Sequence, residues 1–281
     1  MTEPAASSTL AYALERVSGH FMHVIYFDLS RYLIVAGVMT ALLLVFRKWA
    51  NNRRIQTKQP KFSDYRREVL SSIRTVMVYA GVTLAILVGR EVGLINLSLE
   101  SFTLFTLAWQ VVLMVLLHDA YFYWIHRAMH SKRLFRATHQ HHHKSRTPTP
   151  WASYSFTVWE AAIEVAFVPL FLIVTSLFGL SYAGLAIVIF VWHQMVRNVM
   201  AHAGHELFPA GWVDNPWTDW ISTTTHHDLH HSDRHNFGFY FTWWDRMMGT
   251  EHPRYKEEFR KNAKPFIILN DAEPPSVTGQ A

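Results

Sequence analysis

Five long apolar segments restrict the fold of this 281-residue chain more than any other feature. A helix needs about 20 mostly apolar residues to cross the hydrocarbon core of a bilayer. The candidate spans cover residues 25–46, 73–88, 102–117, 161–178 and 180–196. They predict an all-α integral membrane protein with four to five transmembrane helices.

Four residues modify this interpretation. Asp28 and Arg31 place charge inside the first segment. Pro169 is expected to kink the fourth segment, because proline removes a helical hydrogen bond, and Gly179 is a natural break before the fifth. The last two segments therefore form either two full spans or one short hairpin.

The charges between the segments predict how the chain lies in the membrane. Residues 47–68 carry eight lysines and arginines against one aspartate and one glutamate. Loops rich in lysine and arginine stay on the cytoplasmic side. Counting spans from there returns residues 118–160 and 197–281 to the same side. The net charge of +5 is thus explained by membrane orientation, and it does not indicate nucleic-acid binding.

Histidine is concentrated in a way that random scatter does not produce. Twelve of the 18 histidines fall within residues 118–143 and 226–235. The chain has no cysteine, which excludes disulfides, thiolate zinc sites and a fused iron–sulfur module.

The spacing of these histidines predicts that they share helical faces. The third apolar segment continues without Gly or Pro into HDAYFYWIHRAMH, where two histidines stand four residues apart. HQHHH and HHDLHH each repeat an i, i+3, i+4 spacing, and HAGHE adds a further histidine at the end of the fifth segment. The candidate ligands are His126, His130, His139, His142, His143, His202, His227, His230 and His231.

This set is too large for one ion. Neutral imidazole suits iron, copper, zinc and nickel, and one metal takes about six ligands at most. Eight aligned histidines, with His202 as a ninth, therefore predict two metal ions. Four acidic residues are expected to hold the other ring nitrogen of these histidines: Asp119, Glu206, Asp228 and Asp233. His118 and His205 stay undecided, and His141 and His226 are expected to lie behind the ligands or in solvent.

The three groups HRAMH, HQHHH and HHDLHH resemble the histidine boxes of the fatty acid hydroxylase and sterol desaturase superfamily. The stretches HKSRTPTPWASYSF, HAGHE and NFGFYFTWWDRMMGT are similar too, and the likeness covers roughly residues 105–250. The resemblance implies a helical cap on the cytoplasmic side, carrying a dimetal site. It also implies two iron ions, which zinc can replace in purified protein, and O2 as co-substrate.

By the same resemblance the chain oxidises a membrane lipid. A fatty-acyl, sterol or related lipid would be hydroxylated, and desaturation on the same scaffold is the alternative. Since no redox module is fused, the electrons come from an external donor, a ferredoxin or cytochrome b5 with its reductase. We expect a bacterial inner membrane with a cytoplasmic active site, or else the endoplasmic reticulum membrane.

Two other functions fit the histidines less well. A membrane zinc hydrolase typically carries HExxH, but no histidine stands four residues after His205. A metal transporter should have ionisable residues inside its spans, and the middles of the second to fifth segments have almost none. The expected organisation is an N-terminal membrane region (1–104), a histidine-box catalytic domain (105–250) and a C-terminal tail (251–281), whose last residues, 271–281, are expected to be disordered.

Overall fold

The structure is a computed structural model that describes residues 6–99 and 102–265. It is almost entirely helical, as the sequence predicts. Its α-helices are α1 (Ala6–Ser18), α2 (Phe21–Val45), α3 (Arg47–Asn51), α4 (Phe62–Glu91), α5 (Leu104–Met129), α6 (Phe135–Thr138), α7 (Val158–Val165), α8 (Phe167–Leu177), α9 (Gly184–Ala201), α10 (Thr224–Ser232), α11 (Trp243–Met248) and α12 (Tyr255–Asn262). Three short 3₁₀ helices are η1 (His142–Lys144), η2 (Pro150–Tyr154) and η3 (Trp212–Asp214), and two short strands are β1 (Leu97–Ser98) and β2 (Tyr182–Ala183).

Within residues 6–99 and 102–265, five helical segments are long and apolar enough to cross a membrane: α2, α4, α5, the pair α7–α8, and α9. Two of them extend well past the apolar residues that predict them. The helix α4 begins at Phe62, where the Asp64 carboxylate accepts the Lys61 backbone N–H and caps the first turn. The helix α5 continues to Met129 and so carries the first histidine pair beyond the apolar stretch.

The fourth segment is broken where its proline acts. Pro169 has no N–H to donate to the carbonyl of Val165, and α7 ends at that residue before α8 begins at Phe167. Gly179 then takes a φ of +71°, a left-handed conformation that favours glycine, and the chain turns toward β2. Both breaks were expected from the sequence.

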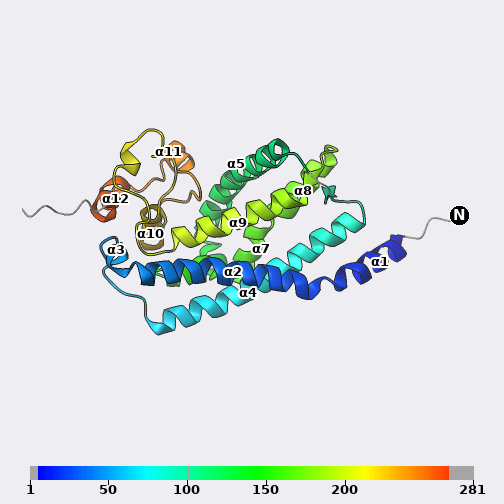
Figure 1. Cartoon of the computed structure of the whole chain (residues 1–281), viewed down its shortest axis with the longest axis horizontal. Coiled ribbons are helices and arrows are strands. Elements are labelled where there is room, and N and C mark those ends of the chain that lie inside the picture. The colour runs from blue at the N-terminus through cyan, green and yellow to red at the C-terminus, as the bar shows by residue number, and fades with distance from the viewer. Residues whose placement is uncertain (1–5, 100–101, 266–281) are drawn as a thin grey trace, which may run out of the picture.

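The helices form a bundle with the short elements gathered at one end (Figure 1). There α3, α10, α11 and α12 lie beyond the ends of the long helices, whereas the parallel pair of β1 and β2 links the far ends of α4 and α9. The helix α12 packs through Tyr255 and Phe259 onto Phe208 and Val213, so the residues just after position 250 belong to this cap. The tail expected over residues 271–281 lies outside the described residues.

The basic loop 47–68 lies at the same end as the histidine-rich segments. Arg53 is almost fully buried and donates to the carbonyls of Glu206, Phe208, Lys264 and Pro265. The expectation that this loop and the histidines share one end of the bundle is thus confirmed. That this end is cytoplasmic stays a prediction.

Candidate metal centre

The nine predicted ligands converge at the cap end of the bundle in two compact groups. Within each group, one ring nitrogen from every histidine lies within 4.8 Å of all the others. The first group, cluster A, is His126, His130, His139, His143 and His230; the second, cluster B, is His142, His202, His227 and His231.

Three stretches of chain set the direction of these rings. His126 lies on the last turn of α5, and His130 is its C-cap. Thr223 accepts the N–H of His226 and so fixes the start of α10, three of whose four histidines, His227, His230 and His231, belong to the clusters. The stretch HQHHH differs from the single helical face that was expected, since His139 ends α6 and His142 begins η1.

In cluster A the histidine rings approach one another through their Nε2 atoms. His126 and His139 lie 2.9 Å apart by these atoms. His143 lies 3.0 Å from His230 and 3.2 Å from His130, and His130 lies 3.2 Å from His230. All five rings therefore turn their outer nitrogen toward one point.

Cluster B is built in the same way around His202, the C-cap of α9. Its Nε2 lies 3.0 Å from that of His227, 3.1 Å from that of His142 and 3.2 Å from that of His231. His227 and His231 are themselves 3.2 Å apart. His202, the first histidine of HAGHE, thus lies at the centre of cluster B, in contact with three histidines from the other groups.

The opposite ring nitrogens show which tautomers are present. The Nδ1 atoms of His126, His202 and His230 lie 2.7–3.0 Å from the carbonyls of Phe237, Asn198 and His235. The Nδ1 of His139 lies 2.5 Å from a carboxylate oxygen of Glu160. A carbonyl or carboxylate only accepts, so each Nδ1 carries the proton and each Nε2 carries a lone pair.

Lone pairs facing one another across about 3 Å repel unless a cation lies between them. His202 is the clearest case, because its Nδ1 donates to a carbonyl and its Nε2 has one lone pair, yet three other Nε2 atoms lie 3.0–3.2 Å from it. Two clusters of such nitrogens fit two metal ions of the borderline kind that imidazole prefers. The donor set therefore suits the dinuclear site that the sequence predicts.

The electrostatics keep these rings neutral. Burial, together with the neighbouring imidazoles, lowers the pKa of His130 to about 2. Burial likewise lowers the pKa of His143 to about 3 and that of His202 to about 4. At neutral pH the histidines are unprotonated, which is the form that binds a metal.

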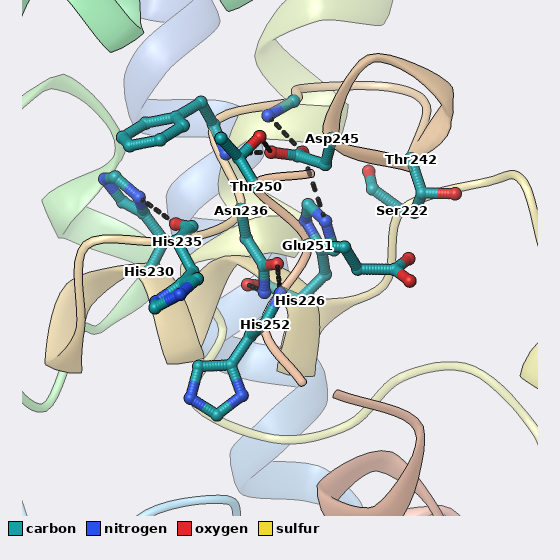
Figure 2. A network of polar contacts seen from close by, with 12 residues as sticks. Ser222, His226, His230, His235, Asn236, Thr242, Asp245, Thr250, Glu251 and His252 are labelled. Atoms are coloured by element: carbon teal, nitrogen blue, oxygen red, sulfur yellow. Dashed lines mark hydrogen bonds and ion pairs between the residues drawn. The ribbon is translucent and has the colours of Figure 1, made fainter. Parts of the chain in front are cut away.

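The loop between α10 and α11 holds the rings of His230 and His126 from behind, and Figure 2 shows the contact of His230 with His235. Asp245 accepts the N–H groups of Phe237 and Gly238 and the hydroxyl of Thr250, and it lies 3.5 Å from His226. The Asn236 amide bridges the carbonyl of His226 and the N–H of His252. These bonds fix the carbonyls of His235 and Phe237, which in turn orient His230 and His126.

The predicted acidic partners are wrong in every case. Asp119 accepts from Tyr240, Phe241 and Trp243; Glu206 from Phe208 and Thr225; and Asp228 from Gln56. Asp233 lies beside His235 and His252, which belong to neither cluster. These carboxylates hold the backbone and loops of the cap in place, and among the described residues none of their bonds reaches a clustered histidine.

The carboxylate that does meet a clustered ring, Glu160, was missed. It lies on the first turn of α7 with no exposed surface, and Glu164 follows one turn later. The signal was present in the sequence, since two acids four residues apart at the start of an apolar segment are costly in a membrane and therefore point to function.

The undecided histidines lie outside both clusters. His118 sits in a cage of aromatic rings that includes Phe167, Phe190 and Tyr240. The Nδ1 of His205 bonds the nearby carbonyl of Ala203. His141 bonds Ser71, and His226 faces Asp245 behind cluster A.

A third group of possible ligands, Asp233, His235 and His252, differs from the two clusters. The Nδ1 of His252 accepts the N–H of Arg254, so its proton lies on the Nε2 that faces Asp233 at 3.6 Å. The ring N–H of His252 faces a carboxylate here and no lone pairs oppose each other, so the group needs no cation to hold it together.

Two cavities adjoin the clusters. A small one of about 10 Å³, roughly the room of one water molecule, touches histidines of both clusters together with Phe122, Phe156, Phe239 and Glu164. A larger cavity of about 480 Å³ lies among α2, α4, α5, α7, α8 and α9 and is lined mainly by aliphatic and aromatic side chains. Glu164 lines both, so the large cavity ends beside the histidines.

Comparison with known proteins identifies similar chains. The family model described as fatty acid hydroxylase matches residues 111–250. The chain is 25% identical to a Delta(7)-sterol 5(6)-desaturase of Gibberella zeae, over 80% of this chain and 70% of that protein. It is 26% identical to lathosterol oxidase of Homo sapiens, over 69% of this chain and 64% of that protein. A Delta(7)-sterol 5(6)-desaturase of Aspergillus fumigatus is 28% identical over 87% of this chain and 68% of that protein.

These matches leave about a third of each relative's length without a counterpart in this chain. No solved structure matches the chain.

Proposed function

We propose that this chain, which belongs to the fatty acid hydroxylase and sterol desaturase superfamily, is an O2-dependent oxidoreductase that oxidises a membrane lipid at a di-iron centre. The observation that carries the proposal is the pair of histidine clusters, whose Nε2 lone pairs face one another in two adjacent groups. Five candidate spans and an apolar cavity that ends beside these clusters suit a substrate drawn from the bilayer.

The two ions would be held separately, one by cluster A and one by cluster B. Iron bound there would supply the oxidising power needed to break an unactivated C–H bond with O2 and two electrons, which redox-inert zinc cannot do. The carboxylate of Glu160 fixes the tautomer of His139, and the loop carbonyls of His235 and Phe237 fix those of His230 and His126.

The protein also controls what reaches the ions. Phe122, Phe156 and Phe239 border the small cavity between the clusters and keep bulk water out of it. That cavity leaves little room for water, so these three rings would shield a carbon atom placed at the end of the larger cavity. Restricting water in this way favours oxidation of the lipid over loss of the oxidant.

The product is a hydroxylated lipid or a new double bond. Hydroxylation requires removal of one hydrogen, followed by transfer of oxygen to the same carbon; desaturation requires removal of a second hydrogen instead. The names of the sterol desaturase relatives favour desaturation as the second candidate. Both reactions need electrons, which we assign to an external ferredoxin or cytochrome b5 with its reductase.

The spans and the relatives also indicate which membrane holds the protein. Five apolar helices suit a multi-pass protein. The relatives compared are eukaryotic, which favours the endoplasmic reticulum over a bacterial inner membrane. In either membrane we assign the histidine end to the cytoplasmic side, because the basic loop 47–68 lies there.

The test compares total lipids of cells expressing the wild-type chain and a His227→Ala, His230→Ala variant, grown under 18O2. Loss of these rings removes one ligand from each cluster. His23→Ala is the matched control, since His23 is exposed on α2 and far along the chain from both clusters. Mass spectrometry should find a lipid that gains one labelled oxygen, or loses two hydrogens, with the wild type and the control only.

If purified wild-type protein holds no iron and no lipid changes with any donor, the proposed function is wrong. A labelled oxygen distinguishes hydroxylation, and loss of two hydrogens without label distinguishes desaturation.

A further inference from the structure

A separate cavity lies at the histidine end of the bundle, outside the metal centre and the large apolar cavity. Its volume is about 190 Å³, and it is formed by the last turn of α2, the basic loop 47–68 and the segments 147–150 and 203–205. The basic loop leads from α3 to the start of α4 at this end of the bundle (Figure 1). Since α2 and α4 are both candidate spans, the cavity lies where spans leave the apolar core of a bilayer.

The charges around this cavity have one sign. Among the described residues, three cationic side chains line it and no carboxylate does. Arg47 and Lys58 are exposed, Arg54 is half-buried, and none of the three forms an ion pair within residues 6–99 and 102–265. The guanidinium of Arg54 donates to the side-chain oxygen of Asn51, which also lines the cavity. Since lysine and arginine stems are flexible, the three charged ends can converge on one anion.

The apolar surface beside the cavity indicates what kind of molecule carries that anion. Leu43 and Leu44 line the cavity next to Arg47, and Leu44 is 67% exposed. Val45, the last residue of α2, is 72% exposed, and Phe62, the first residue of α4, is 83% exposed. Apolar side chains on the outer surface of a span contact acyl chains in a bilayer. An amphiphile with an anionic head and apolar chains therefore matches both surfaces.

Two of the lining segments meet beside the metal centre. The N–H of Ile55 in the basic loop donates to the carbonyl of Gly204 at 3.2 Å, and Gly204 lies two residues after His202 of cluster B. A Cβ at position 204 would lie 2.9 Å from the carbonyl of Pro148, so glycine is needed where these segments approach. A molecule bound in the cavity would thus hold the basic loop against the turn that follows His202.

We propose that this cavity binds the headgroup of an anionic phospholipid. Its phosphate pairs with Arg47, Arg54 and Lys58, and its acyl chains lie against the exposed apolar residues at the ends of α2 and α4. Basic pockets between spans at the cytoplasmic side are typical sites for such headgroups. A zwitterionic headgroup brings an ammonium group among three cations and is therefore disfavoured. A cavity of about 190 Å³ admits a headgroup but not the surface of an acidic protein.

The test compares two lipids with identical acyl chains. Native mass spectrometry of the purified full chain in non-ionic detergent measures the binding of dioleoyl phosphatidylglycerol and of dioleoyl phosphatidylcholine. Each lysine or arginine near an anionic headgroup strengthens binding about five-fold, so three of them predict that the first phosphatidylglycerol binds about 10- to 100-fold more tightly.

Two cavity variants should lose this preference. A triple variant removes all three cations, and the ratio of the two affinities should fall to within about three-fold: Arg47→Gln, Arg54→Gln, Lys58→Gln. The single variant Lys58→Glu changes one exposed residue and should have the same effect, because a carboxylate in the cavity repels the phosphate. The matched control removes three exposed cations that do not line the cavity, and it should keep the preference: Lys48→Gln, Arg66→Gln, Lys132→Gln.

Thermal unfolding provides a second measurement on the same proteins. Because a ligand that binds the folded state stabilises it, phosphatidylglycerol should raise the unfolding temperature of the wild type and the control, but not of the two cavity variants. Phosphatidylcholine and inorganic phosphate should have a smaller effect on the wild type, since the first lacks net charge and the second lacks acyl chains.

Equal binding of the two lipids by the wild type, or an equal loss of preference in the control, overturns the inference. Stabilisation by inorganic phosphate as large as that by phosphatidylglycerol also overturns it, because the site would then bind a free anion. Cavity variants that keep the lipid preference but no longer bind an acidic ferredoxin would assign these cations to a protein partner instead. None of these measurements requires turnover, so they are independent of the proposed reaction.

Discussion

Replacing Glu160 with glutamine should weaken one of the two metal sites and spare the other. The Glu160 carboxylate lies 2.5 Å from Nδ1 of His139, and neither side chain is more than 2% exposed. Its charge fixes the proton on Nδ1 and makes Nε2 a better ligand. The amide of glutamine keeps the shape of the side chain but not the charge.

The expected size of the effect follows from this one bond. A hydrogen bond to a charged group is worth roughly 1.5–3 kcal/mol, and about 1.4 kcal/mol corresponds to a factor of ten in affinity. The affinity of cluster A should therefore fall about 10- to 100-fold, while four of its five histidines stay unchanged. Cluster B contains no ring bonded to Glu160, so its affinity should stay within a factor of about three of the wild type.

Metal-free protein is titrated anaerobically with Co(II), whose binding is detected by visible absorption. A second titration uses Fe(II), whose binding is measured as the amount of metal bound per chain. Glu164→Gln is the control, because Glu164 lies one turn further along the same segment, is also buried, and makes no bond to a histidine within the part of the chain that the structure describes. Equal weakening of both sites, or an effect of Glu164→Gln as large as that of Glu160→Gln, would refute this role for Glu160.

Three further predictions follow from the cap. Gly238→Ala should lower the metal content of both sites and the thermal stability, because a Cβ there would lie 2.4 Å from the Phe241 carbonyl and 2.8 Å from Asp245. Metal analysis and thermal unfolding measure the two effects. The control is Gly211→Ala, whose Cβ meets nothing within 4 Å but whose φ of +85° strains alanine, so it should lower stability but not metal content. Arg53→Met should destabilise the protein by about 3 kcal/mol, because it leaves buried carbonyls without donors, and chemical unfolding in detergent measures this. Metal-free protein should lose stability as the pH falls from about 6.5 toward 4. The folded pKa values of His143 and His202, about 3 and about 4, lie below the unfolded value of about 6.5, so the unfolded chain takes up protons first and each such histidine lowers the free energy of unfolding by about 1.4 kcal/mol per pH unit. Unfolding curves at several pH values measure this slope, and a flat pH dependence would exclude it.

The parts of the fold that the sequence predicts are those set by local chemistry. Apolar runs of sufficient length define the five spans, and Pro169 and Gly179 act on the backbone where they stand. The start of α4 and the end of α5 could not be predicted from hydropathy, because both helices extend into polar sequence. Helical spacing also singled out eight of the nine clustered histidines, since periodicity on a helix is a local property, and His202 was added because it ends the fifth apolar segment.

The groups that orient the rings could not be derived in this way. Four carboxylates near the histidines in sequence were expected to serve, yet the rings bond Glu160, 21 residues from His139, and the carbonyls of Phe237, Asn198 and His235. A backbone carbonyl has no signature in the sequence, because every residue has one. Which carbonyl meets His126 or His230 depends on the loop held by Asp245, and therefore on contacts made only after the chain has folded.

The division of the histidines between the two sites is a consequence of the same packing. The group HQHHH gives His139 and His143 to cluster A and His142 to cluster B, and α10 gives His230 to cluster A but His227 and His231 to cluster B. Neighbouring rings on a short helix diverge by about 100° per residue, so a group of histidines with one apparent face can border two ions on either side of it. Each of these segments thus holds both sites at once. A displacement of α10 must alter the geometry of both ions, whereas a change behind a single ring, such as that at Glu160, can act on one.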